Sequence, residues 1–147
     1  MNAAENKTLV MDGYRQFQHG DIVHLLDRYH DDAEWIGPES DLVPFAGKFH
    51  GRAGIAQFFE ALDASVQATR FQPLHMVAEG DKVVVIGEST WAAKTTGRSY
   101  DSAWVHVFTV RDGKIARFES YYDTAAAERA FHPELFTQAS TATQLHH

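Results

Sequence analysis

Apolar residues recur at helical spacing through the first half of the chain. This pattern predicts a first helix that ends at His19–Gly20. A short second helix follows, capped by Asp21 and reaching Tyr29. A third periodic segment predicts a helix from about Arg52 to Val66. Three helices are therefore expected before any extended sheet begins.

The segment between the second and third helices lacks that periodicity. Ala33–Ile36 is a short apolar run that predicts a strand, and Gly37–Pro38 ends it. The stretch Gly37–Gly51 holds two of the four prolines and three glycines. Proline and glycine interrupt regular structure, so we expect a loop there.

After Thr69 the pattern becomes that of strands. Runs rich in β-branched and aromatic residues occur at Val83–Ile86, Ala103–Val110 and Ile115–Tyr122. Turn signals separate these runs at Gly80–Asp81, Thr96–Gly97 and Asp112–Gly113. The order predicts a four-stranded antiparallel meander. A last helix, Thr124–Phe131, follows it with Asp123 at the capping position.

Two-residue turns at Thr96–Gly97 and Asp112–Gly113 predict which residues face each other. In that register His106 faces Glu119, Trp104 faces Tyr121, and Ser102 faces both Trp91 and Asp123. Because side chains alternate along a strand, one face should carry Trp91, Ser102, Trp104, His106, Glu119, Tyr121 and Asp123. The opposite face should carry Val105, Val107, Phe118 and Tyr122.

The first of these faces mixes large aromatic side chains with titratable groups. A plain core excludes unpaired carboxylates, and a plain solvent face does not gather so many aromatic rings. The combination is typical of a small-molecule pocket. We therefore predict an α+β fold in which N-terminal helices cover a curled antiparallel sheet around a central pocket. One domain is expected over residues 1–133, with a tail over 134–147.

Composition narrows the possible functions. The chain has 147 residues, a net charge of −7, only 13 Lys and Arg, and no cysteine. Nucleic-acid binding, disulfides and thiolate chemistry are therefore not expected. No apolar stretch is long enough for a membrane span, and Met1–Thr8 lacks an apolar signal core, which predicts a cytoplasmic protein. The histidines lack metal-site spacing, and no cofactor is expected. His146 and His147 are left out of the site.

Three stretches carry a family resemblance that covers about residues 5–132. They are "GYRQFQHGD" with "YHDDAEW", "PFAGKFHGRAGIAQFF", and "TTGRSYDSAWVHVFTVRDGKIARFESYYDTA". Their order resembles the cone-shaped fold shared by ketosteroid isomerase, limonene epoxide hydrolase, scytalone dehydratase and the SnoaL-like polyketide cyclases. The resemblance implies a cone-shaped barrel with a central pocket.

The sequence also departs from these enzymes. Epoxide hydrolases of the limonene type use an Asp–Arg–Asp set, of which only Asp123 is matched. Ser89 and Trp91 stand where the resemblance requires the other two, so this activity is not expected. Gly37 replaces the base that ketosteroid isomerase places before a proline. The cyclases pair a histidine with an acid, and His106 matches that histidine.

The candidate site residues each have two interpretations. His106 is a proton-transfer group oriented by Glu119 or Asp123, or else forms a structural His–Glu pair. Asp123 is a pocket acid or only the cap of the last helix. The ligand-contacting candidates are Tyr14, Trp35, Trp91, Trp104 and Tyr121, whose alternative role is core packing or, for Tyr14, a half-buried position on the helix surface.

Two functions follow from these candidates. The first is a cofactor-independent enzyme that uses general acid–base chemistry on a small hydrophobic cyclic substrate, of the isomerase, cyclase or dehydratase type. The second is a non-catalytic module that binds a small ligand or assembles as a dimer. In either case the apolar outer sheet face predicts a homodimer. Nucleic acid and membrane are not expected as partners.

Overall fold

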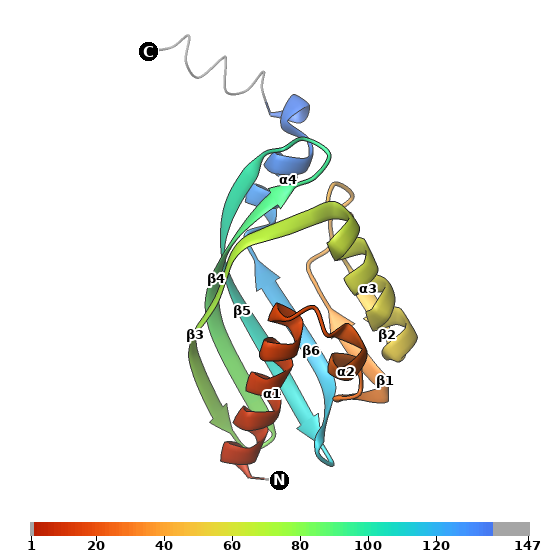
Figure 1. Ribbon diagram of the computed structural model, residues 1–147, viewed down its shortest axis with the longest axis vertical. Helices are drawn as coiled ribbons and strands as arrows, with labels where there is room; N and C mark the ends of the chain where they lie inside the picture. The colour runs from red at the N-terminus through yellow and green to blue at the C-terminus, as the bar shows by residue number, and fades with distance from the viewer. Residues whose placement is uncertain (1, 137–147) are drawn as a thin grey trace.

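The computed structural model describes residues 2–136, which form four α-helices and six strands (Figure 1). The helices are α1 (Ala3–Gln18), α2 (Ile22–Leu26), α3 (Gly51–Ser65) and α4 (Thr124–Phe131). The strands are β1 (Tyr29–Ile36), β2 (Lys48–His50), β3 (Val66–Glu79), β4 (Lys82–Ala93), β5 (Ser99–Arg111) and β6 (Lys114–Tyr122). A 3-10 turn, Pro133–Leu135, follows α4. Most of the predicted tail, with His146 and His147, lies outside the described residues.

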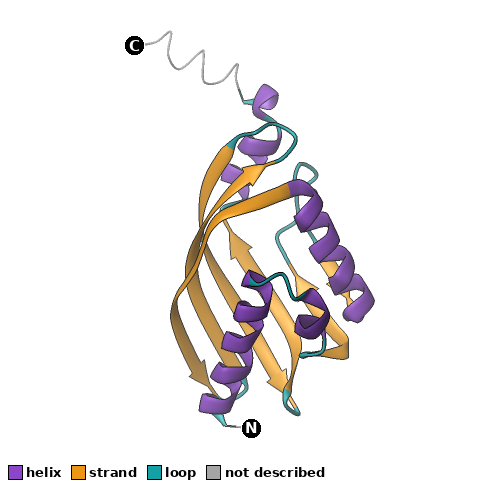
Figure 2. Ribbon diagram, in the orientation of Figure 1, coloured by secondary structure: helices purple, strands orange, loops and turns teal. Residues whose placement is uncertain are grey.

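The strands form a single curled sheet in the order β2-β1-β6-β5-β4-β3. Strands β3 to β6 form the predicted antiparallel meander, and β1 joins β6 in parallel. Helices α1, α2 and α3 cover one face of this sheet, and α4 lies at its far end (Figures 1 and 2). The sheet is not closed, because β2 and β3 remain at its edges. Within residues 2–136, no helix is long and apolar enough to cross a membrane.

The predicted helix boundaries hold except after α2. Helix α1 stops just before His19–Gly20, and the Asp21 side chain caps α2 through the His24 amide, as predicted. Helix α2 ends at Leu26, so the prediction that it reaches Tyr29 was wrong. Tyr29 instead begins β1, and its partner on β6 is Ile115. This extended position buries the Tyr29 ring in the interior.

The β5–β6 hairpin begins as predicted and then slips by one residue. Asp112 and Gly113 have φ values of 50° and 77°, and Arg111 faces Lys114. A bulge beyond the turn adds one residue to β6, so His106 faces Ser120. The predicted pairs of His106 with Glu119 and of Trp104 with Tyr121 were therefore wrong. A one-residue slip exchanges the two faces of a strand.

The slip places Phe118, Ser120 and Tyr122 inside the molecule, whereas Glu119 and Tyr121 face outward. The β4–β5 hairpin differs from the prediction by two residues, with Ser89 opposite Ser102, because a longer loop replaces the expected Thr96–Gly97 turn. A shift of two residues preserves the faces. Trp91, Ser102 and Trp104 therefore remain on the inner face, as predicted.

Only some of the apolar residues predicted to form a dimer contact lie on the outer face of the sheet. Val105 and Val107 do lie on it, beside the exposed Ile86 of β4. Phe118 and Tyr122 do not, because the bulge turns them inward. The homodimer stays a prediction.

A candidate ligand pocket around Tyr14 and His106

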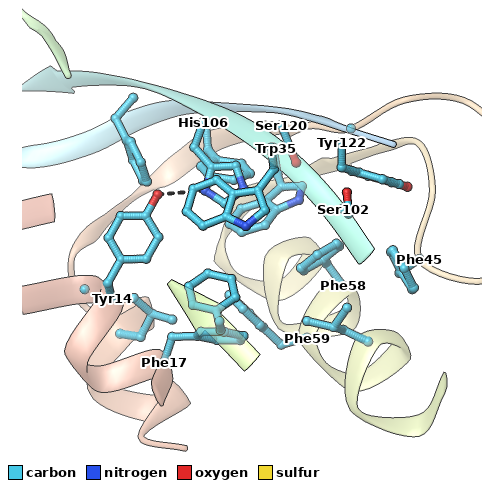
Figure 3. A pocket seen from close by; sticks show the side chains of 18 of the residues that line it. Tyr14, Phe17, Trp35, Phe45, Phe58, Phe59, Ser102, His106, Ser120 and Tyr122 are labelled. Carbon is cyan, nitrogen blue, oxygen red and sulfur yellow. Dashed lines mark hydrogen bonds between the residues drawn. The ribbon is translucent and has the colours of Figure 1, made fainter. Parts of the chain in front are cut away.

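A cavity of about 110 Å³ lies between the covering helices and the inner face of the sheet (Figure 3). Aromatic side chains from α1, α3 and five strands form most of its wall. In the part of the chain that the structure describes, no Asp, Glu, Lys or Arg side chain lines it. Its hydroxyl and imidazole groups belong to Tyr14, Tyr29, Tyr100, Ser102, His106, Ser120 and Tyr122. The indole N–H groups of Trp35, Trp91 and Trp104 are its other polar side-chain groups. The cavity therefore suits an uncharged, largely apolar ligand.

A hydrogen bond between Tyr14 and His106 is the main polar feature of this cavity. Tyr14 lies on the buried side of α1, and His106 lies near the middle of β5. The Tyr14 hydroxyl and His106 Nδ1 are 2.7 Å apart (Figure 3). Two elements far apart in the sequence thus meet at this pair of polar atoms.

Aromatic stacking holds the His106 ring in place. Its centroid lies 4.1 Å from that of Trp104, with the planes 19° apart. The Phe118 ring packs edge to face against the imidazole, with the two ring centroids 4.8 Å apart. Trp104 is itself held by a 2.6 Å hydrogen bond from its Nε1 to the Ser89 hydroxyl. This arrangement restricts the imidazole to one orientation.

Burial keeps both members of the Tyr14–His106 pair uncharged at neutral pH. It lowers the pKa of His106 to about 3, although the ring retains some accessible surface where it borders the cavity. Burial, with a smaller contribution from Tyr29, raises the pKa of Tyr14. A neutral imidazole carries one N–H, and the Tyr14 hydroxyl carries one O–H. Because their mutual hydrogen bond uses one of these two protons, the other can be donated to a ligand.

The structure brings together only some of the predicted site residues. Tyr14, Trp35, Trp91, Trp104 and His106 all line the cavity. Tyr121 does not: it is 54% exposed and donates a hydrogen bond to Glu119 at 2.8 Å.

Neither predicted acid lies at His106. Glu119 faces outward, where the Tyr121 hydroxyl and Arg117 lower the pKa of its carboxyl. Asp123 accepts a hydrogen bond from the Ala126 amide at 3.0 Å and caps α4. The arrangement of a carboxylate orienting the imidazole, expected from the sequence, is therefore absent among residues 2–136. The same residues contain no cluster of three metal-ligating His, Asp or Glu side chains.

Tyr29, Ser120 and Tyr122 line the cavity but were not singled out from the sequence. A signal for the last two was present in the alternation of β6. Arg117 and Glu119 are charged, and the positions next to each of them are Phe118 and Ser120. If the charged residues of β6 face solvent, the alternation of side chains along the strand turns Phe118, Ser120 and Tyr122 inward. No comparable signal marks Tyr29, because its spacing also fits the preceding helix.

The capping role of Asp123 can be separated from a catalytic one. We expect Asp123→Ala to lower the free energy of unfolding by about 1 kcal/mol, because the Ala126 amide loses its acceptor. Asp123→Asn should retain the cap, since asparagine is an equally good capping residue. Denaturant unfolding of both variants measures this difference. Loss of ligand turnover in a stably folded Asp123→Asn protein would instead show a chemical role.

The comparisons with known proteins agree with this architecture. A solved NTF2-like protein from Burkholderia xenovorans LB400 is 34% identical, with a TM-score of 0.82 over 89% of this chain and 98% of that one. TerC, co-crystallised with polyporic acid, is 30% identical, with a TM-score of 0.78 over 87% and 98%. No curated protein matches the sequence. The family model of the SnoaL-like domain matches residues 10–118. The chain therefore belongs to the SnoaL-like domain family.

Proposed function

We propose that this protein is a cofactor-independent enzyme that acts on a small, uncharged ring compound bearing a carbonyl oxygen. The observation that carries this proposal is the 2.7 Å hydrogen bond between Tyr14 and His106, in a cavity whose wall has no ionic side chain from residues 2–136. The pair donates its remaining proton in a hydrogen bond to the substrate oxygen. The reaction belongs to the isomerase, cyclase or dehydratase type.

These reaction types share one electronic requirement. Each can proceed through an enolate-like species, in which a C–H proton passes to a base and negative charge develops on an oxygen. When His106 Nδ1–H donates to the Tyr14 oxygen, the Nε2 lone pair of His106 accepts that proton and the Tyr14 hydroxyl donates to the substrate oxygen. A preorganised donor in an apolar site stabilises that charge, and removing one such donor typically costs about 10²–10³-fold in rate. A neutral histidine with a depressed pKa can polarise a carbonyl without becoming charged. His106 therefore acts as a hydrogen-bond donor, or passes this role to Tyr14 when its own Nδ1–H faces the tyrosine oxygen.

The cavity limits the size of the substrate. An engineered cavity of about 150 Å³ in another protein accepts benzene. The present cavity, at about 110 Å³, is smaller, so a substrate of one ring requires a small movement of its walls and a larger substrate a greater one. The aromatic wall provides stacking surfaces for such a ring. Because TerC was co-crystallised with polyporic acid, that compound is also a probe in the binding experiment described below.

A second candidate function is ligand binding without turnover. The lack of a carboxylate on the cavity wall in residues 2–136 favours it, because no strong base is positioned beside the ligand. Both functions predict that the ligand binds. Only the enzyme is expected to exchange the ligand's acidic C–H hydrogens with solvent.

Proton exchange distinguishes the two functions without knowledge of the natural substrate. We expect the protein in D₂O to bind cyclohex-2-enone and to accelerate deuterium incorporation at its enolisable carbons, followed by NMR. Tyr14→Phe should reduce this acceleration about 10²-fold, because the donor pair is broken. Binding without exchange would support the second candidate. Failure of cyclic ketones and polyporic acid to bind would contradict both.

A further inference from the structure

Ser89 is a polar residue of the protein interior that lies outside the cavity wall. It faces Ser102 on the inner side of the sheet, is 0% exposed, and is not among the described residues that line the cavity. A buried hydroxyl group loses its hydrogen bonds to water on folding, so it requires a partner within the protein. Any contribution of Ser89 to the site must therefore pass through another residue.

The partner of Ser89 is the indole of Trp104. Trp104 Nε1 donates a hydrogen bond to Ser89 Oγ at 2.6 Å, and this bond is buried. Gly87, two residues earlier on the same face of β4, lies against Cζ2 and Cη2 of the same edge of the indole. Gly87 leaves room for the ring, and Ser89 binds its N–H group. Strand β4 therefore determines where this edge of the indole lies.

Trp104 transmits this constraint to the donor pair. Its ring lines the cavity, and the His106 ring stacks on it with the centroids 4.1 Å and the planes 19° apart. Stacking keeps two rings nearly parallel but accepts many offsets, so it leaves them free to slide and rotate in their planes. A hydrogen bond weakens steeply when its donor turns away from its acceptor, so the Ser89 hydroxyl removes that freedom from the indole. The imidazole placed on this indole then meets the Tyr14 hydroxyl through Nδ1.

We propose that Ser89 is a positioning residue, which acts through Trp104 to hold the His106 ring in the orientation that directs the donor pair at the ligand oxygen. This inference rests on the proposed function, because the Tyr14–His106 pair is the group that Ser89 orients. Ser89 itself touches no reacting atom. A well-directed donor acts mainly on the charge that develops during the reaction, so loss of Ser89 should lower turnover and change KM little.

NMR of the empty protein tests whether Ser89 positions the two rings. The chain has three tryptophans, and the indole N–H resonance that Trp104→Phe removes belongs to Trp104. We expect Ser89→Ala to move this ¹H resonance upfield, because the N–H loses its acceptor, and to change the ¹⁵N shift of His106 Nδ1. Ser89→Cys keeps a weak acceptor and should give smaller changes. Ser65→Ala is the matched control, since the buried Ser65 donates to the Ala61 carbonyl in α3, and it should change neither resonance.

A double-mutant cycle tests the effect on the reaction, with the deuterium exchange of cyclohex-2-enone as the assay. We expect Ser89→Ala to lower kcat about tenfold with KM nearly unchanged, since a misplacement of about 1 Å can cost about 10²-fold. In the Trp104→Phe background the same substitution should have no further effect, because the N–H that Ser89 binds is gone. Ser65→Ala should keep the wild-type kcat. Circular dichroism at the assay temperature shows which variants are folded, and if Trp104→Phe is not, Ser89→Cys replaces it, with a kcat between those of wild type and Ser89→Ala.

The outcomes separate this inference from the proposed function. If Ser89→Ala moves neither resonance, Ser89 does not position His106, so the inference fails and the proposed function stands. The same conclusion follows if Ser89→Ala keeps the wild-type kcat while Tyr14→Phe loses about 10²-fold, or if it lowers kcat equally in both backgrounds. If wild-type protein exchanges no deuterium, the proposed function fails, and the two resonances alone decide whether Ser89 positions His106.

Discussion

Gly87→Ala should destabilise the protein and disturb the site, although Gly87 is not among the residues that line the cavity. Gly87 lies opposite Trp104 in the β4–β5 pairing, and the indole lies against it. A Cβ atom there would lie 2.2 Å from Trp104 Cζ2 and 2.7 Å from the backbone oxygen of Gln72. Overpacking of this kind typically costs about 1–3 kcal/mol. Because Trp104 stacks on His106, its displacement should also weaken ligand binding.

Gly54→Ala is the matched control. This glycine lies in α3, and its added Cβ would meet no atom closer than 3.6 Å. The substitution should leave stability unchanged or raise it by up to about 1 kcal/mol, because alanine favours a helix. Denaturant unfolding gives both values, and tryptophan fluorescence reports the indole environment. Equal stabilities for the two variants would contradict the proposed contact between Gly87 and Trp104.

Acid should destabilise the protein through His106. The pKa of this residue is about 3 in the folded protein and about 6.5 in the unfolded chain. Below pH 6.5 the unfolded chain therefore binds a proton that the folded protein does not, and the free energy of unfolding falls as the pH falls. This contribution is constant above pH 7 and amounts to a loss of about 2 kcal/mol between pH 7 and pH 5.

His106→Gln isolates this contribution from those of the other titratable groups. We expect the variant to be less stable than wild type at pH 7, because it loses the stacking on Trp104. Its free energy of unfolding should change less than that of wild type between pH 7 and pH 5, by about 2 kcal/mol. Urea unfolding of both proteins at pH 7 and pH 5 gives the change in the free energy of unfolding for each. Parallel pH dependences would mean that His106 titrates normally in the folded state.

Much of the fold could be predicted from periodicity and turn chemistry. The Asp112–Gly113 turn was predictable because a two-residue hairpin loop requires positive φ at both positions. Helix α4 was predictable from its cap at Asp123. Tyr29 was misplaced because its spacing from Leu25 fits a helix, and only pairing with β6 makes it extended. Tertiary pairing overrode the local pattern there.

The candidate site was predicted less completely, and one bulge accounts for most of the difference. Turn positions determine a register only where no residue is inserted after the turn. The extra residue in β6 is not marked by glycine or proline, so counting from the turn reversed the faces. Glu119 was consequently placed beside His106, where the structure has Ser120. The partner of His106 is Tyr14, which comes from α1, and a contact between helix and sheet leaves no signal in the spacing of either.

The protonation state of His106 is the most direct test of the donor pair, because this pair requires a neutral imidazole held by Tyr14. ¹⁵N NMR of the ring nitrogens across pH 4–8 measures it. We predict a neutral ring with one protonated nitrogen throughout this range, and a change in the Nδ1 shift in Tyr14→Phe. A midpoint near 6.5, with both nitrogens protonated at pH 5, would show that His106 is not the neutral member of a donor pair.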